Sequence, residues 1–152
     1  MLASSPIRKV QMNEYTIMLI DDDEVDRYLL KRALKSAGYV SYIFEADNGQ
    51  AAIDFLSNYE DNAKLYPEKF PPIIIFLDIN MPLMNGFEFL EAFVKLRTCT
   101  RVFDNSMLAL YTSSKCEEDK QKVQGYDFVK GYLIKENLTA QNLKRTIESC
   151  TI

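Results

Sequence analysis

Residues 73–90 read IIIFLDINMPLMNGFEFL, and this stretch carries the clearest signal of the fold. Its first five residues are all apolar and do not alternate with polar ones, so the strand that they predict has both faces covered, as in a parallel sheet. Asp78 ends the apolar run, Pro82 and Gly86 mark a loop, and Phe87 begins an apolar pattern with helical spacing. The stretch therefore predicts a buried parallel strand, a loop and a helix.

The same succession of strand and helix repeats along the chain. Apolar or β-rich runs predict four more strands, at 15–20, 40–45, 107–111 and 129–134. A helical pattern follows each of them, beginning near Val25, Asn48, Lys115 and Thr139, with Gly38 as a stop signal and Thr139 as an N-cap. Five alternating units predict an α/β sandwich with right-handed crossovers.

Two segments lie outside this alternation. Residues 57–72 are polar and contain three prolines, which predicts a long surface connection. Residues 1–13 have no strong pattern and are interpreted as a short N-terminal arm that need not be ordered. Residues 14–152 are then one domain, as the length of 152 residues suggests.

Composition excludes several functions. A formal net charge of -4 gives no general attraction to nucleic acid or to an anionic membrane. The chain has no apolar run long enough for a signal peptide or a membrane helix. Its three cysteines are scattered, which predicts reduced thiols in a cytoplasmic protein. Since the sequence contains no histidine, it has no Ser-His-Asp triad, no histidine zinc site and no phosphohistidine.

Polar side chains follow four of the five predicted strands: Asp21-Asp22, Asp78, Thr112-Ser113 and Lys135. Ligands bind outside the carboxyl ends of open parallel sheets, so these groups are expected to meet there. Clustered carboxylates repel unless a cation neutralises them, and Mg²⁺ prefers such oxygen ligands. An ionised Asp78 beside Mg²⁺ can attack phosphorus, while Lys135 and the Thr112 hydroxyl contact the phosphoryl oxygens.

Each of these side chains also has an ordinary structural interpretation. Acids before a helix, here Asp21, Asp22 and Asp23, can cap it and complement its dipole. Thr112 can belong to a turn and Lys135 can simply be solvated. Four separate structural causes in this order explain the set less well than one site for phosphate and Mg²⁺.

In these motifs the chain resembles the receiver domain of two-component response regulators over about residues 15–152. The matching blocks are LIDDDEVDRYLLKRAL at 19–34, the stretch at 73–90, LYTSS at 110–114 and GYLIKE at 131–136. The resemblance implies a flavodoxin-like (βα)5 three-layer sandwich with a parallel five-stranded sheet in the order 2-1-3-4-5.

The resemblance also implies a role for each site residue. It makes Asp78 the phosphoacceptor, which Thr112 and Lys135 assist. The implied ligands of Mg²⁺ (or Mn²⁺) are Asp21, Asp22, Asp78 and the backbone carbonyl of Asn80. The implied switch residues are Thr112 and Tyr132, and the residues implied to tune dephosphorylation are Asn80 and Ser114.

One position departs from the family pattern. Many receivers have a proline, joined by a cis bond, directly after the lysine, whereas this chain has Glu136. The turn that aims Lys135 is therefore held in another way or is less rigid.

The implied function is signalling. A sensor histidine kinase or a histidine phosphotransfer protein passes a phosphoryl group to Asp78, and an unknown downstream protein reads the change. No output domain, nucleic acid or membrane is expected to take part, and a monomer is expected. The protein would not be a conventional enzyme, because it catalyses only its own phosphorylation and dephosphorylation. A relay intermediate, an effector and a phosphate sink all remain open.

Three other classes stay as alternatives. A phosphatase or phosphotransferase that forms an aspartyl-phosphate would need a second acid at position 80, where this chain has Asn80. A receiver-like module that only binds partners would not need the full set of acids, hydroxyl and lysine. A flavin-binding protein of the same fold would need a phosphate-binding loop after the first strand, and none follows Ile20.

Overall fold

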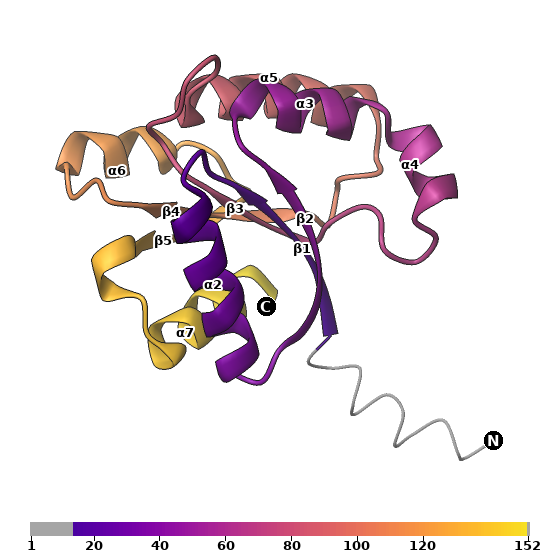
Figure 1. The fold of residues 1–152 in the computed structure, drawn as a ribbon. Helices are drawn as coiled ribbons and strands as arrows, with labels where there is room; N and C mark the ends of the chain where they lie inside the picture. The colour runs from indigo at the N-terminus through magenta and orange to yellow at the C-terminus, as the bar shows by residue number, and fades with distance from the viewer. Residues whose placement is uncertain (1–13, 152) are drawn as a thin grey trace, which may run out of the picture.

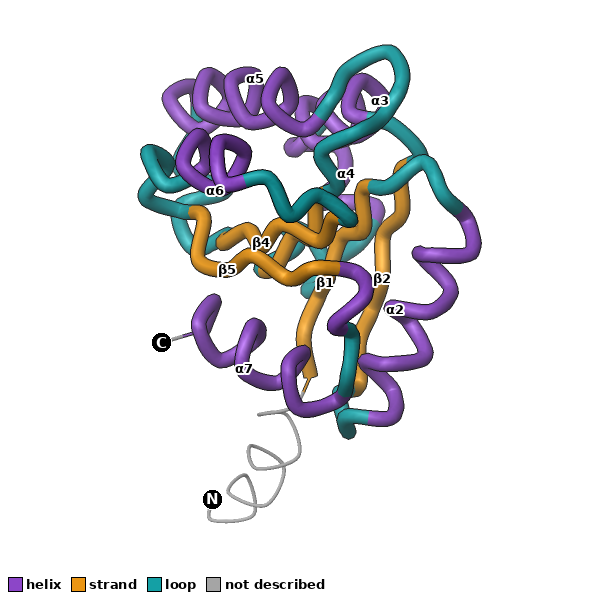
Figure 2. The backbone as a smooth tube through the Cα atoms, turned by 90° about the vertical axis from the view of Figure 1, so that its left-hand side faces the viewer, coloured by secondary structure: helices purple, strands orange, loops and turns teal. Residues whose placement is uncertain are grey.

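The computed structural model describes residues 14–151, which form a parallel sheet between two layers of helices (Figures 1 and 2). The strands are β1 (Glu14–Ile20), β2 (Val40–Ala46), β3 (Ile74–Leu77), β4 (Met107–Thr112) and β5 (Val129–Ile134). The helices are α2 (Glu24–Ser36), α3 (Gly49–Ser57), α4 (Tyr59–Leu65), α5 (Gly86–Cys99), α6 (Glu117–Val123) and α7 (Ala140–Thr151), with a 3-10 turn, η1 (Lys135–Asn137).

The strand order is β2-β1-β3-β4-β5, and each neighbouring pair is parallel. The predicted fold class, a flavodoxin-like sandwich with the order 2-1-3-4-5, is therefore confirmed. The helices α2 and α7 cover one face of the sheet, and α3, α5 and α6 cover the other (Figures 1 and 2).

The two covered faces explain the unbroken apolar runs of the strands. In β1, Ile17 and Leu19 pack into the cluster under α2 and α7, while Met18 and Ile20 pack into the cluster under α3 and α5. All four side chains are at most 1% exposed. Because successive side chains of a strand point to opposite faces, both sets must be apolar when both faces are covered.

Several helix ends lie where the sequence predicts them. Gly38, just after α2, has a φ of 91°, a left-handed conformation that glycine adopts without a steric cost. The Asn48 side chain accepts a hydrogen bond from the Ala51 N–H and caps α3. Thr139 Oγ1 accepts one of 3.0 Å from the Asn142 N–H, so Thr139 is the N-cap of α7 as predicted.

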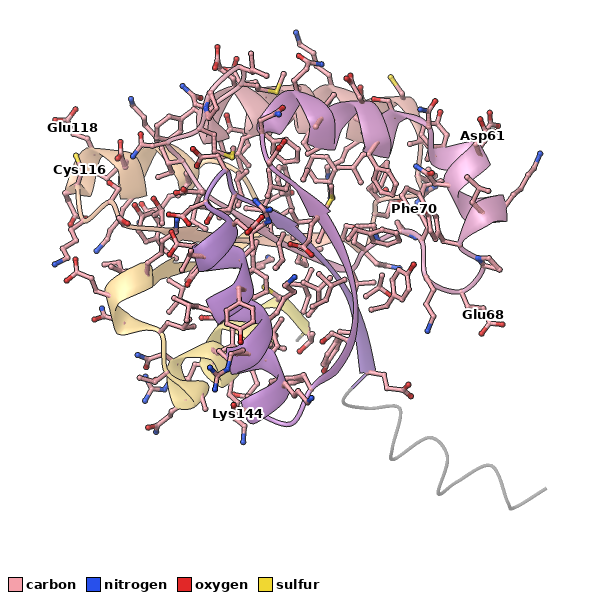
Figure 3. The ribbon with its side chains drawn as sticks, viewed as in Figure 1. Asp61, Glu68, Phe70, Cys116, Glu118 and Lys144 are labelled. Carbon is pink, nitrogen blue, oxygen red and sulfur yellow. The ribbon has the colours of Figure 1, made fainter. Side chains whose placement is uncertain are left out.

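The segment 57–72 differs from the expected surface connection, because it contains the helix α4 and contributes to the core. Asn62 of α4 is buried and donates a hydrogen bond from Nδ2 to the carbonyl oxygen of Phe55 at 2.6 Å. Figure 3 shows Phe70 turned into the molecule, while Asp61 and Glu68 point away from it. The polar side chains of Asp61 and Glu68 lie on the outer side of the segment, whereas Asn62 and Phe70 are buried.

The helices and the cysteines also bear on predictions made from the sequence. Within residues 14–151, no helix is both long and apolar enough to cross a membrane. The cysteines at positions 99, 116 and 150 are free thiols, as predicted. The expected arm at 1–13 and the last residue of the chain, Ile152, lie outside the described residues.

Candidate functional site

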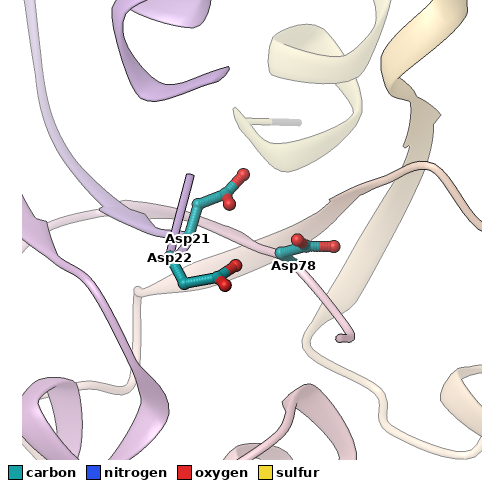
Figure 4. A group of neighbouring side chains, drawn as sticks. All are labelled: Asp21, Asp22 and Asp78. Atoms are coloured by element: carbon teal, nitrogen blue, oxygen red, sulfur yellow. The ribbon is translucent and has the colours of Figure 1, made fainter. Parts of the chain in front are cut away.

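Three acidic side chains meet at the carboxyl edge of the sheet. Asp21 and Asp22 follow β1, and Asp78 follows β3, whose Leu77 pairs with Ile20. One carboxylate oxygen of each acid lies within 4.8 Å of the other two. Figure 4 shows the three side chains next to one another. Since Asp21 and Asp78 are buried and Asp22 is exposed, the cluster is open to solvent on one side.

Asp21 has a buried oxygen, Oδ2, whose partner in the protein is Lys135. Its Oδ1 accepts a 2.9 Å hydrogen bond from the Asp23 N–H. Its Oδ2 is buried and lies 2.8 Å from Lys135 Nζ in an ion pair, and no other group among residues 14–151 donates a hydrogen bond to it. Burial raises the pKa of Asp21 to about 6, although Lys135 acts in the opposite direction. Lys135 brings one positive charge to a cluster of three acids, so the cluster has negative charge left for a cation, and its oxygen ligands fit Mg²⁺ or Mn²⁺.

Lys135 connects this cluster to a fourth acid. Its Nζ lies 2.8 Å from Asp21 Oδ2, 2.8 Å from Asp26 Oδ2 and 3.1 Å from Asp78 Oδ2. The Lys135 side chain is only 11% exposed. Burial by itself would lower the pKa of Lys135, but the hydrogen bonds and charges of these carboxylates raise it above its ordinary value. Lys135 therefore carries a positive charge next to Asp78 at neutral pH.

The turn after Lys135 is the short 3-10 helix η1. The Leu138 N–H donates a 3.3 Å hydrogen bond to the Lys135 carbonyl, and the bond between Lys135 and Glu136 is trans. Glu136 Oε2 pairs with Lys115 Nζ at 3.0 Å, with both side chains more than half exposed. Exposed pairs of this kind add little stability, so the pair with Lys115 does not replace the rigidity of a proline.

The backbone around Asp78 is closely packed. Asp78 Oδ1 accepts a 2.8 Å hydrogen bond from the Ile79 N–H, which leaves Oδ2 directed toward Lys135. The Gly86 N–H donates a 2.7 Å hydrogen bond to the Ile79 carbonyl. A Cβ at position 86 would lie 2.6 Å from the Asp78 carbonyl oxygen, so only glycine lets the loop close against the strand end.

The predicted switch residues lie on the two strands beyond β3. Thr112 ends β4 and is fully buried, and its Oγ1 accepts a hydrogen bond of 3.3 Å from the Ser114 N–H. Tyr132 lies on β5 and pairs with Leu110 of β4. The Tyr132 hydroxyl donates a 2.9 Å hydrogen bond to the Ser114 carbonyl. Thr112 and Tyr132 thus contact the same loop, while their role as a switch stays a prediction.

The residues predicted to tune dephosphorylation flank this site. Asn80 is exposed in the loop after Asp78, two residues from the acid. Ser114 is half-buried and its Oγ donates a 2.6 Å hydrogen bond to Asp119 Oδ2 of α6. Their effect on the phosphoryl lifetime, and the role of the Asn80 carbonyl as a metal ligand, stay predictions.

The sequence left two interpretations open for the acids after β1, a helix cap and a metal site, and the structure contains both. Asp23 caps α2, because its Oδ1 accepts hydrogen bonds from the Val25 and Asp26 N–H groups. Asp21 and Asp22 instead join Asp78 in the acidic cluster. The interpretation as a helix cap is therefore right for Asp23 and not for Asp21 or Asp22.

Sequence reasoning missed two residues in the first turn of α2. Asp26 reaches Lys135, as described above. Arg27 donates a 2.6 Å hydrogen bond from Nη1 to the Asp21 carbonyl, and its Nε pairs with Glu45 at 2.9 Å. Both belong to a helix rather than to a strand end, and a search of strand ends alone does not find them.

Taken together, the fold and site define a flavodoxin-like domain with an acidic, lysine-containing site at the carboxyl edge of its sheet. The family model described as "Response regulator receiver domain" matches residues 17–148. The chain therefore belongs to the response regulator receiver domain family, as the sequence motifs predicted. Receivers of this family bind a divalent metal at an acidic pocket and interact with histidine kinases and phosphotransfer proteins.

Individual proteins agree with this assignment. The probable methanogenesis regulatory protein FilR2 of Methanothrix harundinacea is 27% identical over 88% of this chain and 79% of its own length. A two-component response regulator from Cytophaga hutchinsonii is 28% identical, with a TM-score of 0.71 over 90% of this chain and 96% of that one. The Mn²⁺-bound response regulator Rcp1 has a TM-score of 0.63 at 23% identity, over 87% and 88% of the two chains. The chain spans less than half the length of several other curated relatives.

Proposed function

We propose that this chain accepts a phosphoryl group on Asp78, in a reaction that depends on Mg²⁺. The observation that carries the proposal is the environment of the Asp78 carboxylate. It lies at a buried strand end, within 4.8 Å of two further acids and 3.1 Å from the ammonium of Lys135. Receiver family membership and the Mn²⁺ in the Rcp1 structure support the same chemistry.

The donor we propose is the phosphohistidine of a sensor kinase or of a phosphotransfer protein. A carboxylate oxygen of Asp78 attacks phosphorus, the phosphorus–nitrogen bond breaks, and the imidazole leaves with a proton from solvent. When bound, Mg²⁺ supplies positive charge that stabilises the phosphoryl oxygens. Lys135 supplies a second positive charge, and the Ile79 N–H keeps the Asp78 carboxylate oriented.

The proposed consequence is a change around the switch residues. A phosphoryl group replaces the single negative charge of the Asp78 carboxylate with a charge of about -2, next to Lys135. Thr112 lies at the neighbouring strand end and is linked through the Ser114 loop to the Tyr132 hydroxyl. A movement of Thr112 toward the phosphoryl group would disturb this loop and alter the surface formed by β4, α6 and β5, where a protein target can bind.

The proposal also covers the catalytic class, the location and the oligomeric state of the protein. The protein acts on its own Asp78 and is not a conventional enzyme. Its three free cysteines suit a cytoplasmic location, where thiols stay reduced. We propose a monomer that signals through contacts with other proteins.

The proposal is tested by incubation of the full chain with acetyl phosphate and Mg²⁺, followed by intact-mass measurement. The expected result is one added phosphoryl group, which requires Mg²⁺ and is lost in Asp78→Asn. As a matched control, Asp127→Asn removes an exposed acid between α6 and β5 and should be labelled as the wild type is. If the wild type gains no mass under any condition, the chain is a binding module. Turnover of a free phosphoester would indicate an enzyme instead.

A further inference from the structure

Lys135 is held by an acid outside the proposed metal cluster. Its Nζ donates hydrogen bonds to Asp26 Oδ2 at 2.8 Å and to Asp78 Oδ2 at 3.1 Å. Asp26 lies in the first turn of α2, 109 residues away in sequence, and its side chain is 25% exposed. The cluster that fits a cation consists of Asp21, Asp22 and Asp78 and does not include Asp26. Asp26 therefore touches the lysine without being part of the cluster.

Apart from the carboxylates of Asp21 and Asp78, which belong to the proposed metal cluster, little besides Asp26 fixes the long side chain of Lys135. Its backbone belongs to the three-residue turn η1, and the next side chain, Glu136, makes only an exposed ion pair with Lys115. The Tyr111 ring centroid lies 5.6 Å from Nζ and limits the ammonium on one side. Holding a lysine in one geometry costs side-chain entropy, and the Asp26 hydrogen bond is the contact outside the metal cluster that offsets this cost.

We propose that Asp26 is a positioning residue that keeps the Lys135 ammonium directed at Asp78 for phosphoryl transfer. This inference rests on the proposed function. A cation held by Asp21 and Asp78 would draw on the same carboxylates that contact Lys135 and would weaken their hold on the lysine. Asp26 remains as a partner that the cation does not engage, so Lys135 keeps one donor on Asp26 and directs another to the phosphoryl group.

The charge of Asp26 also acts in the opposite direction, since it repels an incoming phosphoryl group. That repulsion acts across a partly exposed site and is screened by water and salt. The contact with Lys135 is direct, at 2.8 Å, and charge-assisted. The net effect of removing Asp26 is therefore a loss of rate.

The test measures the rate constant for phosphorylation of the full chain by acetyl phosphate in Mg²⁺. Asp26→Ala should slow the reaction about tenfold, equivalent to about 1.4 kcal/mol. Asp26→Asn keeps an oxygen that can accept from Lys135, and should slow it only about threefold. Glu24→Ala removes an equal charge from the same helical turn, where Glu24 is exposed and has no side-chain hydrogen bond to residues 14–151. Its rate should stay within about twofold of the wild type.

A double-mutant cycle separates positioning from a general effect on the fold. If Asp26 acts through Lys135, Asp26→Ala should cause no further loss in a Lys135→Ala background. An equal loss in both backgrounds, a wild-type rate for Asp26→Ala, or a faster reaction would each overturn the inference while the proposed function stands. If the wild type itself is not phosphorylated, the proposed function fails and this inference fails with it. Thermal unfolding of each variant verifies that the compared proteins are folded.

Discussion

At the scale of single residues, the position of Asp78 depends on Gly86. The loop that follows the acid returns so closely that a Cβ at position 86 would also lie 2.8 Å from Ile79 Cα. Both close neighbours are backbone atoms, which cannot move aside as the end of a flexible side chain can. The catalytic geometry proposed for Asp78 is therefore tied to the absence of a side chain eight residues later.

We expect Gly86→Ala to destabilise the protein by about 1–3 kcal/mol, because the new methyl group forces a backbone shift. Phosphorylation by acetyl phosphate should slow as well, since the same shift moves the Asp78 backbone. Gly125→Ala is the control, because a Cβ there meets nothing within 4 Å. Denaturant unfolding provides the comparison, and equal stability of the two variants would show that the loop adapts without strain.

At the scale of elements, segment 57–72 packs as part of the domain. Phe70 is buried, and its ring centroid lies 6.2 Å from that of Phe44 in β2, 5.7 Å from Phe55 in α3 and 5.9 Å from Phe103. The aromatic cluster thus links the segment after α4 to the sheet and to the helices above it. Its contribution to stability should be that of a core element.

Phe70→Ala is expected to cost about 3–5 kcal/mol, through lost burial and a cavity that its aromatic neighbours fill only in part. Leu65→Ala, in the same segment, should change the free energy of unfolding by less than about 0.5 kcal/mol, because Leu65 is 70% exposed. The measurement is again unfolding in denaturant. A small loss for Phe70→Ala would restore the interpretation of 57–72 as a surface connection.

The contrast between α4 and the strands shows what the sequence could predict. The strands are predictable because two covered faces require unbroken apolar runs, such as Ile73 to Leu77. The helix α4 has seven residues and is followed by Pro67, so its few apolar positions give no clear period. The contacts of Phe70 with β2 and α3 depend on the tertiary fold. A local sequence pattern carries no information about such contacts.

The same reasoning applies to the site. Asp21, Asp22, Asp78, Thr112 and Lys135 are predictable as strand-end residues, because parallel strands bring their carboxyl ends to one edge. Asp26 is different, since its contact with Lys135 depends on how α2 crosses that edge.

At the scale of the whole molecule, the acidic cluster carries a cost in folding that a cation should relieve. The cluster joins β1 to β3, the central strands, so a bound cation should stabilise the entire sheet. A ligand that binds only the folded chain at about a hundredfold excess over its Kd adds about 2.7 kcal/mol. For a chain of this length, Mg²⁺ should then raise the Tm by roughly 5–10 °C.

The variant Asp21→Asn tests whether the charge of Asp21 causes this loss of folding stability. At about pH 8, above the pKa of about 6, Asp21 is an ionised carboxylate whose burial destabilises the folded protein. Without Mg²⁺, the neutral amide should make the protein more stable than the wild type, by roughly 1–3 kcal/mol. In Mg²⁺ the variant should gain little, because it lacks one of three charged ligands. Asp127→Asn should respond to Mg²⁺ as the wild type does. Two results would contradict the prediction: a wild-type Tm that does not change with Mg²⁺, or an Asp21→Asn variant whose Tm without Mg²⁺ is below that of the wild type. Either result would show that Lys135 alone balances the acids.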